Sequence, residues 1–502
     1  MLQASVVVDR DFRLAEIDSR LYGGFIEHLG RHIYTGIYEP DHPLADQDGF
    51  RSDVMDMVRE LAMPVIRYPG GNFVSGYNWE DGIGPVGERP ARLDLAWKTL
   101  ESNRFGLHEF MNWCGKAGSQ AMLAVNLGTR GVDAARNLVE YCNHPGGTYW
   151  SDLRKKNGAA EPFAVRLWCL GNEMDGPWQI AAKPAAEYGA LARETAKVMK
   201  WIDPGIRVVL CGSSNNQMPT FGSWELEALD QAYEHIDYLS LHHYFKNLDG
   251  DSAAYLAQPE AMYDYIRGAA ACCDAIAAKK RQKRKVSLSF DEWNVWTHTM
   301  SADRELDPWR EAPRLLEEAY TFEDALVVGG MLIALVNSSD RVRMACLAQV
   351  VNVLAPIMAE PGGPCWAQTT FYPFADVSKH GRGEALKAVV DSPLHDAGSL
   401  SDVPYLAAAI TASPEGDGMS AFLLNRHLTE NVEASLDLRS FSANGAYEWT
   451  SLSGHDLKAA NTMTSPRNVV PDMRPGGRIA GGKLKLELPA ASWNCISVRW
   501  EK

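Results

Sequence analysis

The feature that most constrains the fold of this 502-residue chain is a series of eight short apolar runs between residue 20 and about residue 350. Stretches with helical periodicity lie between the runs, and continuous rather than alternating apolar runs are typical of parallel strands buried on both faces. The candidate strands are Leu21–Ile26, Pro64–Arg67, Ala121–Asn126, Val165–Leu170, Ile206–Cys211, Asp237–Leu241, Val286–Phe290 and Arg343–Leu347. Their spacing fits a closed (β/α)8 barrel, with a doubly wound open sheet as the alternative.

Polar side chains follow most of these runs, and their position favours the barrel. They are Glu27 and His28, Arg67 and Asn72, Asn126, Asn172 and Glu173, Ser213 and Ser214, His242 to Tyr244, Asp291 and Glu292, and Gln349. In a closed barrel the carboxyl ends of all strands surround one pocket, where the active site of this fold is built. We therefore predict an α/β fold, a (β/α)8 TIM barrel over residues 18–380 that carries the catalytic centre.

After about Thr370 the pattern changes to short alternating segments separated by Gly, Pro, Asn and Ser, as in an antiparallel sandwich. The candidate strands are Ala385–Val390, Tyr405–Thr411, Ser420–Asn425, Ala434–Leu438, Tyr447–Leu452, Lys483–Leu488 and Asn494–Trp500. We predict a jelly-roll-like β-sandwich domain over residues 381–502. The N-terminal segment 1–17 is expected to join it, because Val6–Val8 lies far ahead of the first barrel strand and needs a sheet to pair with.

Charge, hydropathy and cysteine content limit the partners and the cellular compartment that we expect. Lys and Arg number 49 against 64 Asp and Glu, a net charge of −15, which disfavours a nucleic-acid partner. The apolar run Ala325–Val336 is far shorter than the ~20 residues that cross a bilayer, so we expect a buried helix and no membrane partner. Nine cysteines without repeated spacing, and an N-terminus without a signal-peptide pattern, predict reduced thiols and a cytoplasmic protein.

Two carboxylates at predicted strand ends point to the chemistry. Glu173 lies in the segment Trp168–Trp178 and Glu292 in Ser289–Trp296, so each has tryptophan and polar neighbours. The ends of the fourth and seventh strands lie across a barrel mouth from one another. Two facing carboxyl groups are what glycosidic cleavage requires, one to protonate the leaving oxygen and one to attack or stabilise the oxocarbenium-like centre. An isolated Glu is usually a surface residue, but two at one barrel mouth favour catalysis.

Five motifs carry a resemblance to a known family. They are Tyr22-Gly-Gly-Phe-Ile-Glu-His-Leu-Gly-Arg31, Ile37-Tyr-Glu-Pro40, Arg67-Tyr-Pro-Gly-Gly-Asn72, Gly171-Asn-Glu-Met-Asp-Gly-Pro-Trp-Gln179 and Asp291-Glu-Trp-Asn294. Together they closely resemble glycoside hydrolase family 51, the α-L-arabinofuranosidases, from the first strand through the eighth. The end Ala490-Ala-Ser-Trp-Asn494 is similar to the end of that family's sandwich.

The resemblance implies a mechanism and a set of site residues. Glu173, which follows Asn172, would be the acid/base and Glu292 the nucleophile of a retaining reaction through a covalent arabinosyl–enzyme, with the carboxyl groups about 5–5.5 Å apart. The substrate would be terminal non-reducing α-L-arabinofuranosyl residues of oligosaccharides derived from arabinoxylan or arabinan. The residues implied to bind the sugar are Glu27, Asn72, Asn172 and Gln349. Arg67 and Tyr244 are expected beside Glu292, and His242 beside Glu173.

Other inferences complete the expected site. Trp97 and Trp296 match family positions near the site and are expected to wall the sugar pocket; Trp178 is equally consistent with core packing. The resemblance also implies a homo-oligomer, a hexamer, and no cofactor. Surface beyond the first sugar is expected to come from loops such as Thr299–Pro313.

Three alternatives remain. A metal-dependent hydrolase would use His28, His32, His242 and His243, but adjacent residues on a strand point to opposite faces, and we expect no metal. A carbohydrate-binding protein without activity would not need both Glu173 and Glu292. Another retaining barrel glycosidase, an endo-glucanase or a β-xylosidase, would use the same two carboxylates.

Overall fold

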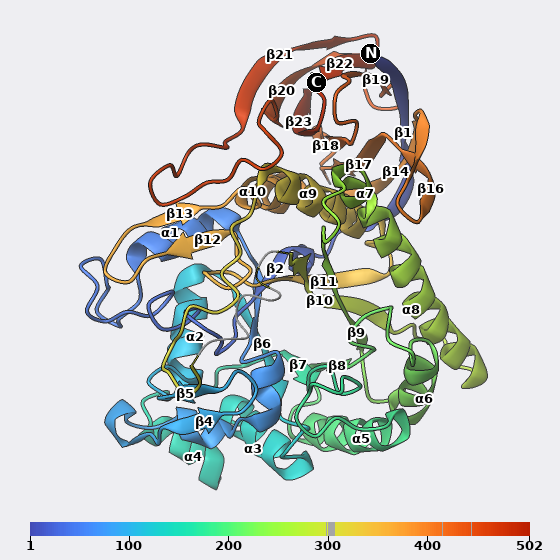
Figure 1. Cartoon of the computed structure of the whole chain (residues 1–502). Coiled ribbons are helices and arrows are strands. Elements are labelled where there is room, and N and C mark those ends of the chain that lie inside the picture. The colour runs from blue at the N-terminus through green and yellow to red at the C-terminus, as the bar shows by residue number, and fades with distance from the viewer. Residues whose placement is uncertain (298, 300–306, 414, 443, 502) are drawn as a thin grey trace.

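The computed structural model describes the whole chain except residues 298, 300–306, 414, 443 and 502. Its N-terminal part is a closed barrel of eight parallel strands in the order β10-β11-β2-β3-β6-β7-β8-β9. The strands surround a common centre in Figure 1, and their bounds are β2 Gly23–Phe25, β3 Val65–Tyr68, β6 Gln120–Val125, β7 Leu167–Leu170, β8 Arg207–Leu210, β9 Tyr238–Phe245, β10 Ser287–Val295 and β11 Val342–Ala348. The predicted TIM barrel is confirmed, and the open sheet is excluded.

Helices cover the outside of the barrel. They are α1 Ser52–Leu61, α2 Leu107–Ala117, α3 Val132–Asn143, α4 Tyr149–Lys156, α5 Ala185–Ile202, α6 Ser223–Ala232, α7 Ser252–Ala257, α8 Pro259–Lys279, α9 Phe322–Asn337 and α10 Phe371–His380. The helix α9 begins after Thr321, whose backbone N–H donates to the Asp324 carboxylate at 2.7 Å. The apolar run Ala325–Val336 lies inside α9 and is buried on every side, as expected.

Most strand boundaries differ from the prediction by one or two residues, and three differences change where residues of the site lie. Leu21 and Tyr22 belong to a short 3-10 helix, η1 Ser19–Tyr22, instead of the first strand. The strands β9 and β10 continue to Phe245 and Val295, so His242, Tyr244, Asp291 and Glu292 lie within strands and do not follow them. Polar side chains are accommodated there because the ends of these strands face other polar groups at the barrel mouth.

The strand β10 contains a β-bulge at the position of the predicted nucleophile. Ser289 pairs with Ser240 and Glu292 with His242, so three steps along β10 correspond to two along β9. On the other side, Phe290 pairs with Ala345 and Trp293 with Leu347, again three steps against two. One extra residue between Phe290 and Glu292 re-aims the side chains of the strand.

The C-terminal domain is the expected β-sandwich. Its hydrogen bonding runs through nine strands: β1 Leu2–Glu16, β14 Glu384–Asp391, β17 Leu406–Ala412, β18 Gly418–Asn425, β19 Val432–Asp437, β20 Asn444–Leu452, β21 Asp472–Ala480, β22 Lys483–Leu488 and β23 Ser492–Trp500. The N-terminal strand β1 pairs antiparallel with β14 and parallel with β19. The pair β1–β19 is therefore parallel, unlike the antiparallel pairs predicted for this domain. The sequence pattern missed β21 and the hairpin β15 Leu394–Ala397 with β16 Leu400–Pro404, because their residues are largely exposed and polar.

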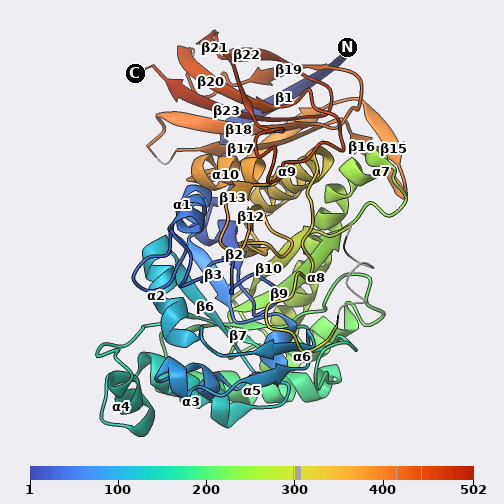
Figure 2. The same cartoon turned by 60° about the vertical axis from the view of Figure 1, so that its left-hand side comes forward.

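The helices α9 and α10 lie between the barrel and the sandwich in both views (Figures 1 and 2). Trp493 of β23 is buried at this junction, and its indole N–H donates to the Asp376 carboxylate of α10 at 2.9 Å. Its ring packs on Gly329 of α9 so closely that a β-carbon at that position would lie 2.5 Å from the ring. The glycine therefore allows the sandwich to dock on the barrel.

We predict that Gly329→Ala lowers the melting temperature, because the added methyl group must displace Trp493 or α9 at a cost of about 1–3 kcal/mol. Thermal unfolding followed by circular dichroism measures the change. The matched control is Gly115→Ala in α2, where an added β-carbon meets nothing within 4 Å and Ala favours the helix by about 0.5–1 kcal/mol. Equal melting of the two variants would contradict the packing argument.

Candidate active site

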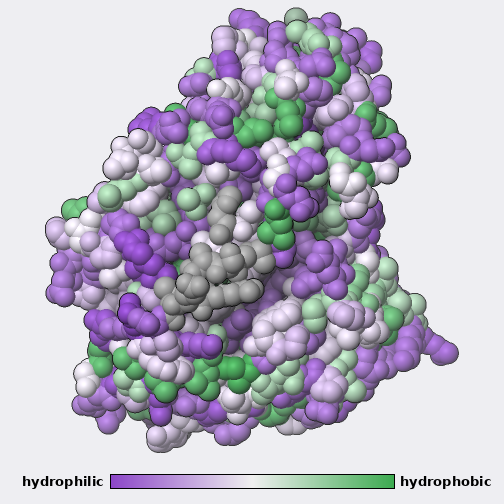
Figure 3. Space-filling view, in the orientation of Figure 1, coloured by the Kyte–Doolittle hydropathy of each residue, from purple (hydrophilic) through white to green (hydrophobic). Residues whose placement is uncertain are grey.

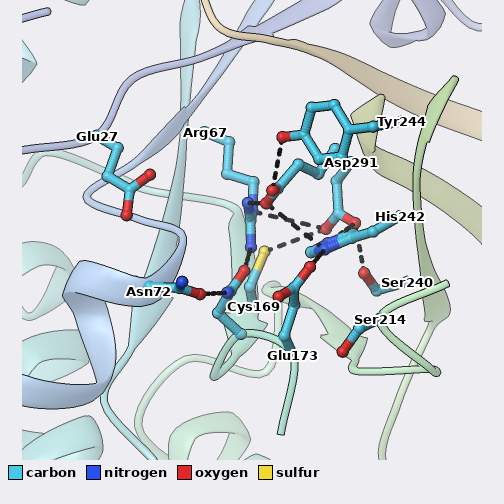
Figure 4. Close-up of polar contacts among 12 residues, drawn as sticks. Glu27, Arg67, Asn72, Cys169, Glu173, Ser214, Ser240, His242, Tyr244 and Asp291 are labelled. Carbon is cyan, nitrogen blue, oxygen red and sulfur yellow. Dashed lines mark hydrogen bonds and ion pairs between the residues drawn. The ribbon is translucent and has the colours of Figure 1, made fainter. Parts of the chain in front are cut away.

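The carboxyl ends of the barrel strands bring the candidate residues to one place. Figure 3 shows a hydrophilic hollow in the face of the molecule that Figure 1 presents, beside residues drawn in grey. In the close-up of Figure 4, Arg67, His242, Tyr244 and Asp291 converge, with Glu173 below them and Glu27 and Asn72 on the opposite side. Each of the site residues expected from the sequence makes a polar or ring contact with another member of the group.

Glu292 on β10 is 8% exposed and receives two hydrogen bonds on its carboxylate. The Tyr244 hydroxyl donates to Oε1 at 2.7 Å, and Arg67 Nη1 donates to Oε2 at 3.1 Å. Both donors fix the orientation of the carboxyl group. Tyr244 also meets the Trp296 ring edge to face, with centroids 5.8 Å apart.

Glu173 follows β7 in a left-handed turn, with φ of +90° at Gly171 and +43° at Glu173. A residue other than glycine in this conformation is strained, and such strain is often found at functional positions. The turn aims the carboxyl group inward: a Glu173 oxygen and a Glu292 oxygen lie within 4.8 Å of one another. Two carboxyl groups this close fit the geometry of retaining glycosidases better than the 6.5–9.5 Å of inverting ones.

Two N–H groups contact Glu173. His242 Nδ1 lies 3.0 Å from Oε1, and the indole N–H of Trp178 donates to Oε2 at 2.6 Å. Burial raises the pKa of Glu173 and the charge of Glu292 adds to this, against the hydrogen bonds from His242 and Trp178, which lower it. Trp178 itself is 50% exposed, so it lies at the outer edge of the site.

His242 on β9 lies among three carboxylates. Besides Glu173, Glu292 is 3.5 Å from Nδ1 and Asp291 is 3.4 Å from Nε2. Burial lowers the pKa of His242, but Glu292, Asp291 and Glu173 together raise it to about 10. These three groups therefore favour the imidazolium form of the ring. Its neighbour His243 points the other way, toward the Tyr265 ring of α8, as strand alternation predicts.

Arg67 on β3 is buried and connects the two halves of the site. Its Nη2 donates to Asn172 Oδ1 at 2.6 Å, in addition to the bond to Glu292, and its Nε is 3.8 Å from Asp291. The guanidinium lies over the Phe25 ring at 4.6 Å. Asn172 Nδ2 is 3.5 Å from the side-chain oxygen of Asn72, which places both amides beside the carboxyl pair.

Glu27 anchors the opposite side of the site. It accepts hydrogen bonds from the Phe73 backbone at 3.0 Å, the Trp97 indole at 2.9 Å and Gln349 Nε2 at 2.9 Å. Burial and the charge of Glu292 raise its pKa to about 8, against the Phe73 and Trp97 bonds. A β-carbon on Gly71 would lie 2.3 Å from Glu27 Oε2, so the backbone approaches the carboxyl group more closely than any other residue type allows.

Some polar residues at the strand ends lie away from the two carboxyl groups, and one residue of the site had no predicted role. Asn126 Nδ2 donates to the Tyr77 carbonyl and the Ser214 backbone N–H donates to Asp175, so both residues fix loops, and their bonds go to neither Glu173 nor Glu292. Asp291 was expected only as one of the polar residues at the strand ends, without a role of its own; the bulge in β10 places it beside Arg67 and His242. Most of the loop Thr299–Pro313 that was expected to extend the substrate surface lies outside the described residues.

Glu173, His242 and Glu292 bring potential ligand atoms close enough to hold a metal ion. Metal ligands must be deprotonated, whereas the neighbouring carboxyl groups raise the pKa of His242 and so favour its protonated form. Arg67 adds a second positive charge next to Glu292. The donor set therefore suits an organic substrate and proton transfer better than a divalent cation.

A parallel eight-stranded barrel with two inward carboxyl groups at the ends of β7 and β10 is the arrangement of a barrel glycoside hydrolase. Two family models match the sequence: the α-L-arabinofuranosidase 1 domain over residues 57–264 and the α-L-arabinofuranosidase C-terminal domain over residues 291–492. The chain belongs to glycoside hydrolase family 51, the α-L-arabinofuranosidases.

Relatives match the chain along its whole length. An intracellular exo-α-(1→5)-L-arabinofuranosidase of Halalkalibacterium halodurans is 54% identical, with 99% of each chain covered. An exo-α-(1→6)-L-arabinofuranosidase of Bifidobacterium longum is 45% identical over 99% of this chain and 97% of its own. The solved family 51 α-L-arabinofuranosidase AbfB of Bifidobacterium longum is 42% identical, with a TM-score of 0.94 and 99% of each chain covered.

Two further observations concern the cellular setting. Within the described residues, every helix is too short or too polar to cross a membrane. The nine cysteines all fall among the described residues and carry free thiols, as predicted.

We predict that Gly71→Ala lowers kcat/KM by about 100-fold, because the added methyl group displaces the Glu27 carboxyl group and a shift of about 1 Å in a binding group costs this much. Initial rates on a chromogenic arabinofuranoside measure the effect. Gly87→Ala serves as the control, since an added β-carbon there meets nothing within 4 Å. Wild-type rates from both variants would show that the position of Glu27 does not limit the reaction.

Proposed function

We propose that the chain is a retaining, exo-acting α-L-arabinofuranosidase with Glu173 as acid/base and Glu292 as nucleophile. It removes terminal non-reducing α-L-arabinofuranosyl residues from oligosaccharides derived from arabinan and arabinoxylan. The observation that carries the proposal is a pair of carboxyl groups with oxygens within 4.8 Å of one another, each accepting hydrogen bonds from its own donors. Glu292 faces the donors Arg67 and Tyr244, and Glu173 faces His242 and Trp178.

The reaction takes two steps. In the first, the Glu292 carboxylate forms a bond to the anomeric carbon while the glycosidic bond breaks, and the proton of Glu173 passes to the leaving oxygen. In the second, Glu173 takes a proton from water, and the water oxygen displaces Glu292 from the anomeric carbon. Each step inverts the anomeric configuration, so the released arabinose has the configuration of the substrate.

Protonation is divided between the two glutamates by their surroundings. Burial and the charge of Glu292 raise the pKa of Glu173, which suits a group that must hold a proton near neutral pH. Once Glu292 has become an ester, its charge no longer opposes ionisation of Glu173. The same side chain then acts as the base toward water.

The remaining residues divide into those that bind the sugar and those that support the carboxyl pair. Arg67 and His242 support it, as their contacts with Glu292 and Glu173 indicate. Amide and carboxyl groups can both accept and donate to furanose hydroxyls, with Glu27 donating in its protonated form. The proposed sugar-binding residues are Glu27, Asn72, Asn172, Tyr244 and Gln349, with Trp97 and Trp296 as the walls.

The substrate and setting follow from relatives and are part of the proposal. Relatives of 54%, 51% and 50% identity are named intracellular exo-α-(1→5)-L-arabinofuranosidases, which favours (1→5)-linked substrates and a cytoplasmic location. A homo-oligomer, a hexamer by family resemblance, is checked by light scattering. We also propose residues 18–380 as the catalytic barrel domain, and residues 381–502 with segment 1–17 as the sandwich domain.

A panel of aryl glycosides tests the sugar specificity. We predict that the aryl α-L-arabinofuranoside is cleaved faster than the β-xyloside and the β-cellobioside, because the site is matched to one terminal furanose. Product analysis on (1→5)- and (1→6)-linked arabino-oligosaccharides, with single arabinose units as the expected product, tests the exo mode and the linkage. Comparable rates on the xyloside or cellobioside would favour the alternative of a β-xylosidase or an endo-glucanase.

Azide rescue tests the two roles. Glu173→Ala should be slow on arabinofuranosides with poor leaving groups, but azide should restore turnover on an activated aryl substrate and give an α-configured arabinofuranosyl azide after two inversions. Glu292→Ala should lose activity by removing the nucleophile, and azide in its place should give the β-configured product after one inversion. Proton NMR distinguishes the anomers, and exchanged outcomes would reverse the two assignments.

A further inference from the structure

Asp291 is the residue that the bulge in β10 adds to the site. The strand β10 has one more residue than β9 and β11 in the stretch where it pairs with them, and Asp291 is the residue that both shifts have in common. Without the bulge, alternation would turn Asp291 away from the side that Glu292 faces. In the structure both carboxyl groups contact Arg67 and His242 (Figure 4).

The position of Asp291 is fixed from three strands. Arg67 Nε lies 3.8 Å and His242 Nε2 lies 3.4 Å from its oxygens, Ser240 donates a hydrogen bond of 2.5 Å, and Cys169 Sγ is 3.6 Å away. Asp291 is 1% exposed, so solvent screens these charges little. Its side chain is less exposed than that of Glu292, at 8%, and its oxygens are taken up by these four side chains.

The charges around Asp291 can be counted. Burial raises the pKa of the surrounding thiols, so they are neutral: these are Cys169, Cys211 and Cys346. Asp175 and Glu27 lie farther out, and burial raises the pKa of each. The charged set at the centre is therefore the cations Arg67 and His242 with the carboxyl groups of Asp291, Glu173 and Glu292.

We propose that Asp291 is a positioning residue whose permanent negative charge holds His242 as an imidazolium and keeps the catalytic centre electrically neutral through both half-reactions. The inference rests on the proposed function. Before the first step, Asp291 and Glu292 balance the two cations while Glu173 holds its proton. After it, Glu292 is an ester and Glu173 has passed its proton to the leaving oxygen, so Asp291 and Glu173 balance the same two cations.

Because the site stays neutral, neither step has to create net charge in a buried place, which would be costly. A carboxylate at position 291 is required for this balance. Without it, the two cations would exceed the anions in every state. Removal of a nearby negative charge favours loss of a proton from Glu173 and from His242. The more acidic of these two groups would therefore lose its proton at a lower pH than in the wild-type enzyme.

The test compares Asp291→Asn with Ser240→Ala, which removes a contact of Asp291 but no charge. We expect Asp291→Asn to move the alkaline limb of the kcat/KM profile to lower pH by about one unit, and Ser240→Ala to leave the limb in place. A purely structural role would lower rates without moving the limb. An unmoved limb in Asp291→Asn, or an equal shift in both variants, would overturn the proposal.

A second measurement does not depend on activity or on the Asp291→Asn variant. Nitrogen-15 NMR of histidine-labelled wild-type enzyme, assigned with His242→Gln, reports the charge of His242 directly. We expect both ring nitrogens to carry protons at pH 8; a neutral ring would overturn the proposal. Failure of the wild-type enzyme to cleave arabinofuranosides would instead refute the proposed function and leave this reading of His242 intact.

Discussion

The buried guanidinium of Arg67 is the group on which the arrangement of the site depends. Removing such a cation from water costs several kcal/mol, and the cost is offset only where charged and polar partners surround it closely. Its partners come from different parts of the barrel: Asn172 after β7, Asp291 and Glu292 on β10, and the Phe25 ring on β2. One side chain on β3 therefore sets the position of the predicted nucleophile and of the amide next to the predicted acid.

The barrel was predictable from the sequence because its strands are buried on both faces. Runs such as Val165–Leu170 and Ile206–Cys211 differ by only a few residues from β7 and β8, since burial leaves a strong pattern in the sequence. Strands with exposed faces leave a weaker one, and β21, with one buried residue among nine, was missed. The ends of β9 and β10 were predicted to lie outside the strands because their residues are polar, and only apolar runs indicated strands.

The sequence predicted which residues belong to the site better than it predicted how those residues are arranged. Side chains at the ends of barrel strands must meet, and the family motifs supplied Glu27, Asn72 and Asn172. The bulge at Asp291 could not be predicted, because it depends on pairing with both neighbouring strands and leaves no local signal. Trp178 is a similar case: its contact with Glu173 depends on the turn after Gly171, which the sequence indicates only by the glycine.

The sandwich contributes to the catalytic barrel through the start of α9. The first turn of a helix leaves backbone N–H groups without partners inside the helix. Here the carbonyls of Ala459 and Leu457, from the sandwich side, accept from Phe322 and Glu323 at 2.8 and 3.0 Å. Glu323 in turn accepts from Asn247 at 3.2 Å and Ser252 at 2.6 Å, in the segment that follows β9. Because β9 carries His242 and Tyr244 and ends at Phe245, these bonds connect the sandwich side of the domain junction to the segment next to the strand that holds two residues of the site.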